Sequence, residues 1–185
     1  SICCYISMLN ELQTNKLIQY ALNDLKKVYI PKIIGSNRYD MELHEITSIE
    51  QIQNFPKSKW GIPEPPDDAI CSIDYANYID IVFVPGVAFD NQCKRLGHGK
   101  GYYDTFLTLL TQKCHELGRD KPPFVGLAFD EQILESVPVE SYDVVLDYVV
   151  TPSSEYSRSQ SDGISSFQNP FTLSSSISES LQDES

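Results

Sequence analysis

The chain has 185 residues, enough for one domain with its own core, and it carries a formal net charge of −12 at pH 7. This charge argues against non-specific nucleic-acid binding, which needs clustered lysines and arginines. No stretch reaches the run of about 18 apolar residues that a membrane span needs, and no secretory signal is visible, so neither nucleic acid nor a membrane is an expected partner.

The first part of the chain predicts alternating strands and helices. The apolar run at the start indicates a buried strand, and Thr14 is placed to cap a helix whose apolar residues continue at helical spacing to Leu25. The expected strands here cover residues 2–7, 27–31 and 41–46, and a short helix covers residues 48–55.

The second part repeats the alternation around one long loop. Residues 78–86 give the strongest strand signal, because β-branched and aromatic residues dominate there. A loop is expected from Pro85 to about Gly101. The elements expected after it are a helix at 102–117, a strand at 123–129, a helical turn at 130–134 and a strand at 143–150. This alternation predicts an α/β fold with a mostly parallel sheet flanked by helices.

The composition divides the chain into one domain and a tail. Residues 1–151 carry the periodic apolar residues, whereas residues 152–185 are acidic, serine-rich and without apolar periodicity. Such a segment buries too little surface to offset its ordering entropy, so disorder is predicted for it. Because Ser1 leads directly into a strand, we also expect that the natural protein has a further N-terminal portion.

The cysteines give neither a zinc pattern nor a disulfide framework, since their number is odd and no C-x-x-C occurs. A reducing compartment, the cytoplasm, is therefore expected, with an organellar signal in an upstream portion left open. The cysteines are Cys3, Cys4, Cys71, Cys93 and Cys114.

The stretch "RLGHGKGYYD", residues 95–104, is the candidate functional loop. Its G-x-G-x-G spacing differs from both the Walker and the Rossmann patterns, and a bare pattern of this kind is as often a simple turn. However, Arg95 and Lys100 add permanent charge, His98 adds a titratable one, and Asp104 adds a carboxylate at the start of the expected helix. Glycines, cations and a carboxylate at a helix start are suited to binding a magnesium nucleotide.

Four stretches in the same order resemble the 5-formyltetrahydrofolate cyclo-ligase family, also called 5,10-methenyltetrahydrofolate synthetases. The most specific is "DIVFVPGVAFD" followed by "RLGHGKGYYD". The others are "YISMLNELQT", "WGIPEP" and "GLAFDEQ" with "VPVESYDVVLDYVVT". The resemblance covers about Cys3 to Thr151.

The resemblance implies an α/β fold of the kind shared with sugar-phosphate isomerases and CoA transferases. It also implies a monomer that uses ATP and Mg²⁺ to convert 5-formyltetrahydrofolate into 5,10-methenyltetrahydrofolate, releasing ADP and phosphate. In the family's usual mechanism the formyl oxygen takes the γ-phosphoryl group, N10 of the folate attacks the activated carbon, and phosphate leaves. A preference for polyglutamylated folate is left open.

The site residues follow from the same resemblance. The nucleotide would be bound by Arg95, Leu96, Gly97, His98, Gly99, Lys100, Gly101, Tyr102 and Tyr103, of which Arg95, Lys100 and Tyr102 are the catalytic candidates. The folate would be bound by Ile6, Glu11, Trp60 and the shared segment His98, Gly99, Lys100, Gly101 and Tyr102. The magnesium ion would be held by Asp104 and Asp143.

Simpler roles remain open for several of these residues. Asp104 could simply stabilise a helix N-terminus, where an acid is favourable, and Asp143 could be a surface acid. Glu11 could be a helix-start residue, and Trp60 could pack in the core instead of lining the folate pocket. Tyr102 and Tyr103 could both serve helix packing, although Tyr102 is favoured for the site.

Two departures from the family bear on activity. The family often has arginine or an aromatic residue where His98 stands, so the charge at this position depends on pH here. The family's N-terminal helix, which brings lysines and arginines to the ATP phosphates, has no counterpart before Ser1. The alternatives are therefore a non-catalytic folate- or nucleotide-binding remnant and an isomerase on the same fold.

Overall fold

The computed structural model describes residues 1–58, 61–66 and 75–158. Its helices are α1 Asn15–Asn23, α2 Ile49–Gln53 and α3 Tyr102–Glu116, with short 3₁₀ turns η1 Tyr75–Asn77 and η2 Asp130–Gln132. Its strands are β1 Ile2–Cys3, β2 Val28–Ile33, β3 Met41–Ile46, β4 Ile81–Val84, β5 Ala88–Asp90, β6 Arg95–Leu96, β7 Phe124–Leu127, β8 Ile133–Leu134, β9 Tyr148–Val150 and β10 Glu155–Ser157. None of the helices in these ranges is long and apolar enough to cross a membrane.

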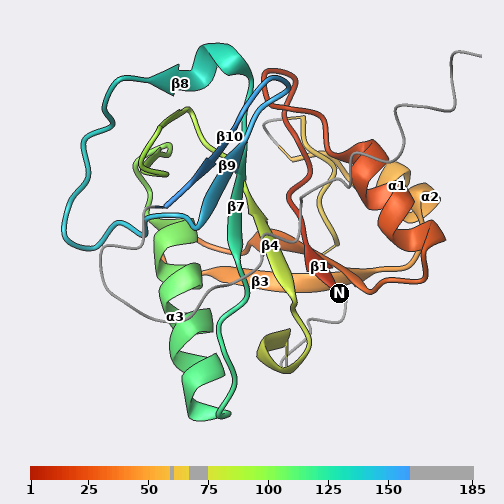
Figure 1. Ribbon diagram of the computed structural model, residues 1–185. Helices are drawn as coiled ribbons and strands as arrows, with labels where there is room; N and C mark the ends of the chain where they lie inside the picture. The colour runs from red at the N-terminus through yellow and green to blue at the C-terminus, as the bar shows by residue number, and fades with distance from the viewer. Residues whose placement is uncertain (59–60, 67–74, 159–185) are drawn as a thin grey trace, which may run out of the picture.

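Within these residues, seven strands form the main sheet in the order β10-β9-β7-β4-β1-β2-β3 (Figure 1). The five inner strands run parallel, and β3 and β10 pair antiparallel at the two edges. The predicted α/β class with a mostly parallel sheet is therefore confirmed.

Helices cover both faces of this sheet, as Figure 1 shows for α3 on one side and α1 with α2 on the other. Val82 and Val84 of β4 pack in one apolar cluster with Leu107 of α3. Phe83, between them, packs in the other cluster with Ile18 of α1. Burial on both faces explains why β4 is a continuous apolar run instead of an alternating one.

The order of the strands makes the gap between β1 and β4 a topological switch point. After β1 the chain continues to β2 on one side, whereas β4, β7 and β9 follow on the other side. The carboxyl ends of parallel strands at such a switch point are the usual place for a ligand. Three segments meet that edge of the sheet: residues 6–11, residues 34–40 and residues 85–101.

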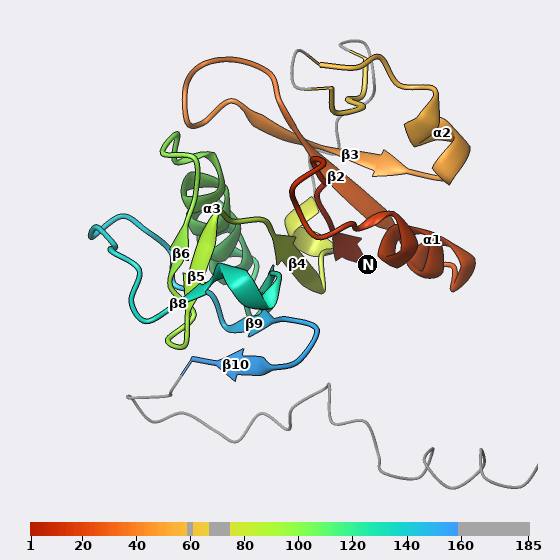
Figure 2. The same cartoon turned by 90° about the horizontal axis from the view of Figure 1, so that it is seen from above.

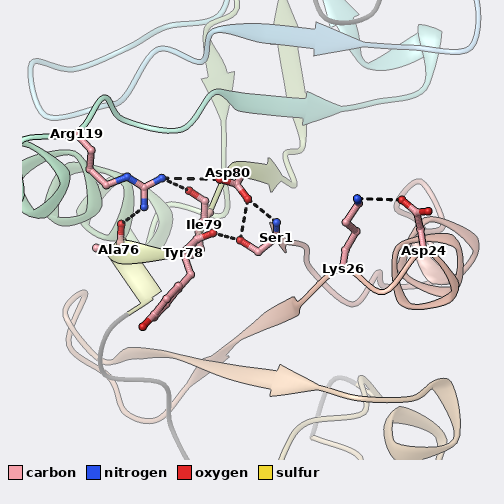
Figure 3. A network of polar contacts seen from close by, with 8 residues as sticks. All are labelled: Ser1, Asp24, Lys26, Ala76, Tyr78, Ile79, Asp80 and Arg119. Atoms are coloured by element: carbon pink, nitrogen blue, oxygen red, sulfur yellow. Dashed lines mark hydrogen bonds and ion pairs between the residues drawn. The ribbon is translucent and has the colours of Figure 1, made fainter.

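The opposite, amino edge is fixed by polar contacts (Figure 3). Arg119, beyond α3, donates to the carbonyl oxygens of Ala76 at 2.7 Å and Ile79 at 3.4 Å, and lies 3.8 Å from Asp80. The Ser1 hydroxyl also donates to Asp80, at 3.2 Å, which links the starts of β1 and β4. The Arg119 side chain is therefore engaged in contacts within the protein. It lies at the end of the strands opposite the carboxyl edge.

Several bounds differ from the sequence prediction, and the strands expected at 2–7 and 143–150 cover only Ile2–Cys3 and Tyr148–Val150. The expected loop 85–101 contains β5 and β6, which join β8 in a small second sheet. Glu155–Ser157 form β10 on β9, so the disordered tail was predicted to start too early; residues 159–185 lie outside the described part. Thr14 stands at the N-cap of α1 but does not cap it, because its hydroxyl donates to the carbonyl of Tyr5 at 2.7 Å.

His44 on β3 is a buried imidazole, 3% exposed, whose two ring nitrogens have no hydrogen-bond partner among the described residues. Burial lowers the pKa of His44, the nearby Lys32 charge lowers it further, and Glu42 opposes the shift. The folded protein therefore resists protonation of this side chain more than the unfolded chain does.

We expect acid to destabilise the fold through His44. Below the unfolded pKa of about 6.5 the unfolded chain binds more protons than the folded one, so stability falls as pH falls, by at most about 1.4 kcal/mol per pH unit. His44→Leu should flatten this dependence in urea unfolding between pH 7.5 and 5.5, whereas His115→Gln, a change at an exposed histidine, should not. Parallel pH profiles for wild type and His44→Leu would contradict the assignment.

Candidate active site

The glycine-rich loop lies between β6 and α3, at the carboxyl edge of the main sheet. Gly99 and Gly101 have positive φ angles of 76° and 69°, which side-chain-bearing residues adopt only with strain. Gly97 is needed for a different reason, because a Cβ atom there would lie 2.8 Å from Nη1 of Arg95. The loop therefore runs close to the Arg95 side chain, and its approach to phosphates stays a prediction.

Arg95 itself is buried beneath this loop. Its Nη2 forms an ion pair with Oδ2 of Asp104 at 2.8 Å, and its Nη1 donates to the carbonyl of Pro85 at 3.3 Å. Its guanidinium also lies 5.7 Å from the ring centre of Tyr103. The side chain is only 5% exposed, so it supports the loop and does not present its charge to solvent.

The predicted magnesium pair does not form a ready metal site. Both oxygens of Asp104 already accept hydrogen bonds, Oδ2 from Arg95 and Oδ1 from the backbone N–H of Val144 at 3.1 Å. That second bond brings Asp143, the neighbour of Val144, close to Asp104 in space, but the Asp143 carboxylate accepts from the backbone N–H of Glu140 at 2.7 Å. The described residues hold no cluster of three or more metal-ligating side chains. Each Asp104 oxygen thus already has one partner, and the roles of Asp104 and Asp143 as metal ligands stay predictions.

The exposed part of the loop is suited to an anion. His98, Gly99 and Lys100 are exposed, and the backbone N–H groups of Gly97, Gly99 and Lys100 donate to no acceptor in the described residues. The first turn of α3 follows at once, and its free N–H groups and helix dipole favour negative charge. Lys100 adds a permanent cation at the same place.

Glu11 approaches the same loop from the end of β1. The backbone N–H of Met8 donates to its Oε2 at 2.8 Å and holds the carboxylate in place. Burial raises the pKa of Glu11, while the Met8 hydrogen bond and the charge of His98 lower it. The charge of His98 thus acts on Glu11 although 87 positions separate them in the sequence, and the segment after β1 and the loop before α3 lie at the same edge of the sheet.

The other predicted site residues have varied positions. Ile6 is half-buried and packs against the cluster that contains Phe83. The Tyr102 hydroxyl donates to the carbonyl of Gly35 at 2.9 Å, so this residue joins α3 to the loop between β2 and β3. Leu96 is 39% exposed. Trp60 lies outside the described residues.

Asp90 is a supporting residue that the sequence interpretation missed. It is 1% exposed, and its carboxylate accepts from three backbone N–H groups: Gln92 at 2.9 Å, Lys94 at 3.0 Å and Val137 at 3.0 Å. These bonds fix the turn between β5 and β6 to a segment far along the chain. An aspartate at the end of a strand before "NQ" is typical of such a turn, and this was the available signal.

Comparisons with known proteins show the family to which the chain is similar. The family model described as the 5-formyltetrahydrofolate cyclo-ligase family matches residues 1–152. A relative from Schizosaccharomyces pombe, named "Probable 5-formyltetrahydrofolate cyclo-ligase", is 36% identical over 156 residues, which cover 82% of this chain and 74% of that protein. The 5-formyltetrahydrofolate cyclo-ligase of Mus musculus is 35% identical over 80% of this chain and 71% of its own length.

A solved structure supports the same relationship. The 5,10-methenyltetrahydrofolate synthetase of Aquifex aeolicus, determined by NMR, superposes with a TM-score of 0.63 at 28% identity. The superposition covers 94% of this chain and 78% of that chain.

Proposed function

The chain belongs to the 5-formyltetrahydrofolate cyclo-ligase family, and we propose that it closes the ring of 5-formyltetrahydrofolate to 5,10-methenyltetrahydrofolate at the expense of ATP. The observation that carries the proposal is the glycine-rich loop before α3, whose exposed Lys100 and whose N–H groups without an acceptor in the described residues lie at the same carboxyl edge of the sheet as the segment after β1 that carries Glu11. One segment offers a carboxylate to a nitrogen-rich ring, and the other offers N–H groups and a cation to phosphates.

Each group has a defined task in this reaction. Lys100 and the free N–H groups of the loop hold the triphosphate, because phosphoryl transfer depends mainly on positioning and charge neutralisation. Glu11 accepts hydrogen bonds from pterin N–H donors and so orients the formyl group toward the γ-phosphate. The formyl oxygen takes the phosphoryl group and ADP leaves; N10 then attacks the formyl carbon, and phosphate leaves as the ring closes.

The magnesium ion is proposed to enter with the nucleotide, since Mg²⁺ usually keeps water and phosphate oxygens as most of its ligands. We propose a monomer, as the family resemblance implies. We also propose a cytoplasmic location, since the cysteines in the described residues, Cys3, Cys4, Cys93 and Cys114, are buried and unpaired.

The test is the absorbance of methenyltetrahydrofolate after the protein is mixed with ATP, magnesium and 5-formyltetrahydrofolate. We expect product to form only when ATP is present. Omission of ATP and omission of folate are the controls. Folate and nucleotide binding without turnover would support the non-catalytic remnant, and substrate conversion without ATP would support an isomerase; either result would overturn the proposal.

A further inference from the structure

The loop between β2 and β3, residues 34–40, is a fixed structure at the carboxyl edge of the sheet. The backbone N–H of Ile34 donates to the carbonyl of Asp40 at 3.0 Å, and that of Asn37 donates to the Asp40 carboxylate at 2.8 Å. The Asn37 side chain in turn accepts from the N–H of Tyr39 at 3.2 Å. These contacts hold Arg38 at the tip of a tight turn.

This tip lies against the beginning of α3. The hydroxyl of Tyr102 donates to the carbonyl of Gly35 at 2.9 Å. A Cβ atom placed on Gly101 would lie 4.0 Å from both Cβ and Cδ of Arg38. Figure 2 shows the loop between β2 and β3 approaching the start of α3. Arg38 is therefore next to the glycine-rich loop, although 63 positions separate it from Gly101.

The ion pairs of the other basic side chains show which cations a phosphate at the glycine-rich loop could not use. Arg95 is neutralised by Asp104 beneath the loop, and Arg119 and Lys121 pair with Asp80 and Asp147 at the amino edge of the sheet. A triphosphate at the loop would thus meet Lys100 as the permanent cation of the loop.

Arg38 is available for such a ligand. It is exposed and forms no ion pair within the described residues. Its contacts are with Tyr39, whose ring centre is 5.3 Å from the guanidinium carbon and whose hydroxyl is 3.5 Å from Nη2. Stacking on the ring and the hydrogen bond from Nη2 to the Tyr39 hydroxyl orient the planar guanidinium, and its other N–H groups have no acceptor among the described residues.

We infer that Arg38 binds a phosphate group of the nucleotide, opposite Lys100 across the glycine-rich loop. This inference rests on the proposed function, because it takes the loop to be the phosphate site. The fork of N–H donors on arginine matches two phosphate oxygens at once. The absence of a side chain at Gly101 leaves the space between Arg38 and the start of α3 open.

The experiment measures the affinity of Arg38→Gln for a non-hydrolysable ATP analogue with magnesium, by calorimetry. We expect the Kd to rise at least about fivefold, and Arg38→Lys to recover part of the loss. The matched control is Lys113→Gln, which removes an exposed cation paired with Glu116 at the other end of α3 and should leave the Kd unchanged. Unfolding midpoints should agree for all variants, because Arg38 is exposed.

Each remaining result overturns the inference or separates it from the proposed function. An unchanged nucleotide Kd overturns it, and so does a loss of folate affinity alone, which would place Arg38 on the glutamate carboxylates of the folate. Wild-type protein that binds the analogue through Arg38 but forms no methenyltetrahydrofolate supports Arg38 and contradicts the cyclo-ligase proposal. Wild-type protein that binds no nucleotide contradicts both.

Discussion

Replacing Arg95 by methionine is expected to destabilise the folded protein by about 3–5 kcal/mol. The substitution removes one partner of a buried ion pair and leaves the Asp104 carboxylate, 13% exposed, without its cation. It also removes the hydrogen bond to the carbonyl of Pro85 and the stacking on Tyr103. Urea unfolding of wild type and variant, followed by circular dichroism, measures the change in the free energy of unfolding.

The double variant Arg95→Met with Asp104→Leu shows whether the cost arises from the unpaired charge. Removing both charges leaves neither partner of this pair as an unpaired buried ion, so a large part of the lost stability should return. The control is Lys113→Met, which breaks an exposed pair and should cost less than about 1 kcal/mol.

The opposite pattern would restore the role that the sequence predicts for Arg95. Suppose that Arg95→Met had the free energy of unfolding of wild type but bound nucleotide weakly. The Arg95 guanidinium of the wild-type protein would then have to contact the ligand in solution. The ion pair between Arg95 and Asp104 would then contribute little to the stability of the fold. That result would favour Asp104 as a ligand of the metal.

The sheet was predictable because its signals are local. The run of β4 is apolar throughout, and α3 begins after Gly101 and ends before Gly118, whose φ is 69°. A strand buried on both faces and a helix with glycines at both ends can be identified from neighbouring residues alone. The family resemblance was equally local, because its strongest motif is one continuous segment.

Short strands with distant partners were not predictable. β5 and β6 have three and two residues, and β8, the other partner of β5, lies some 40 positions later in the chain. No pattern within a two-residue strand distinguishes it from a loop. The tail boundary was wrong for the same reason, since β10 depends on the edge that β9 offers and not on its own composition.

The supporting residues of the site were hidden by sequence distance. From the sequence, Arg95 was interpreted as a free cation. The neighbouring residues do not show that Gly97 lies over its side chain or that Asp104 forms an ion pair with it. Arg38 contacts the glycine-rich loop from a different hairpin, so only the fold brings them together. Glu11 was predicted through the resemblance, and the structure adds that the N–H of Met8 holds its carboxylate at the edge of the sheet where the glycine-rich loop lies.

Glu11 gives the second prediction of a large effect. Its carboxylate is half-buried and held by the N–H of Met8, and it has no other hydrogen bond to the described residues. A carboxylate in this position can accept from N–H donors of a pterin. Hydrogen bonds to a charged group contribute about 1.5–3 kcal/mol, which is a factor of about 10–150 in affinity.

Glu11→Gln is therefore expected to raise the Kd for 5-formyltetrahydrofolate about 10- to 150-fold and to leave nucleotide affinity nearly unchanged. Glutamine has the same shape and can still accept from Met8, so the fold should be retained. Glu131→Gln, a change at an exposed acid on η2, is the matched control and should affect neither ligand. Equal folate affinity for wild type and Glu11→Gln would show that Glu11 does not bind the folate and only fixes the turn after β1.

The pH dependence of folate binding separates the charge of Glu11 from its shape. Burial raises the pKa of Glu11, so this carboxylate takes up a proton at a higher pH than an ordinary glutamate, whose pKa is about 4.3. Only the ionised form accepts two hydrogen bonds with full charge, so wild-type affinity for the folate should fall as the pH is lowered through this raised pKa. Glu11→Gln has no carboxylate to protonate at that position. Its affinity for the folate should therefore not show this fall at low pH, which we call the acid limb of the curve. Calorimetric titrations between pH 7.5 and 5 measure both curves, and an acid limb of equal size in the two proteins would assign the titrating group to the ligand or to another residue.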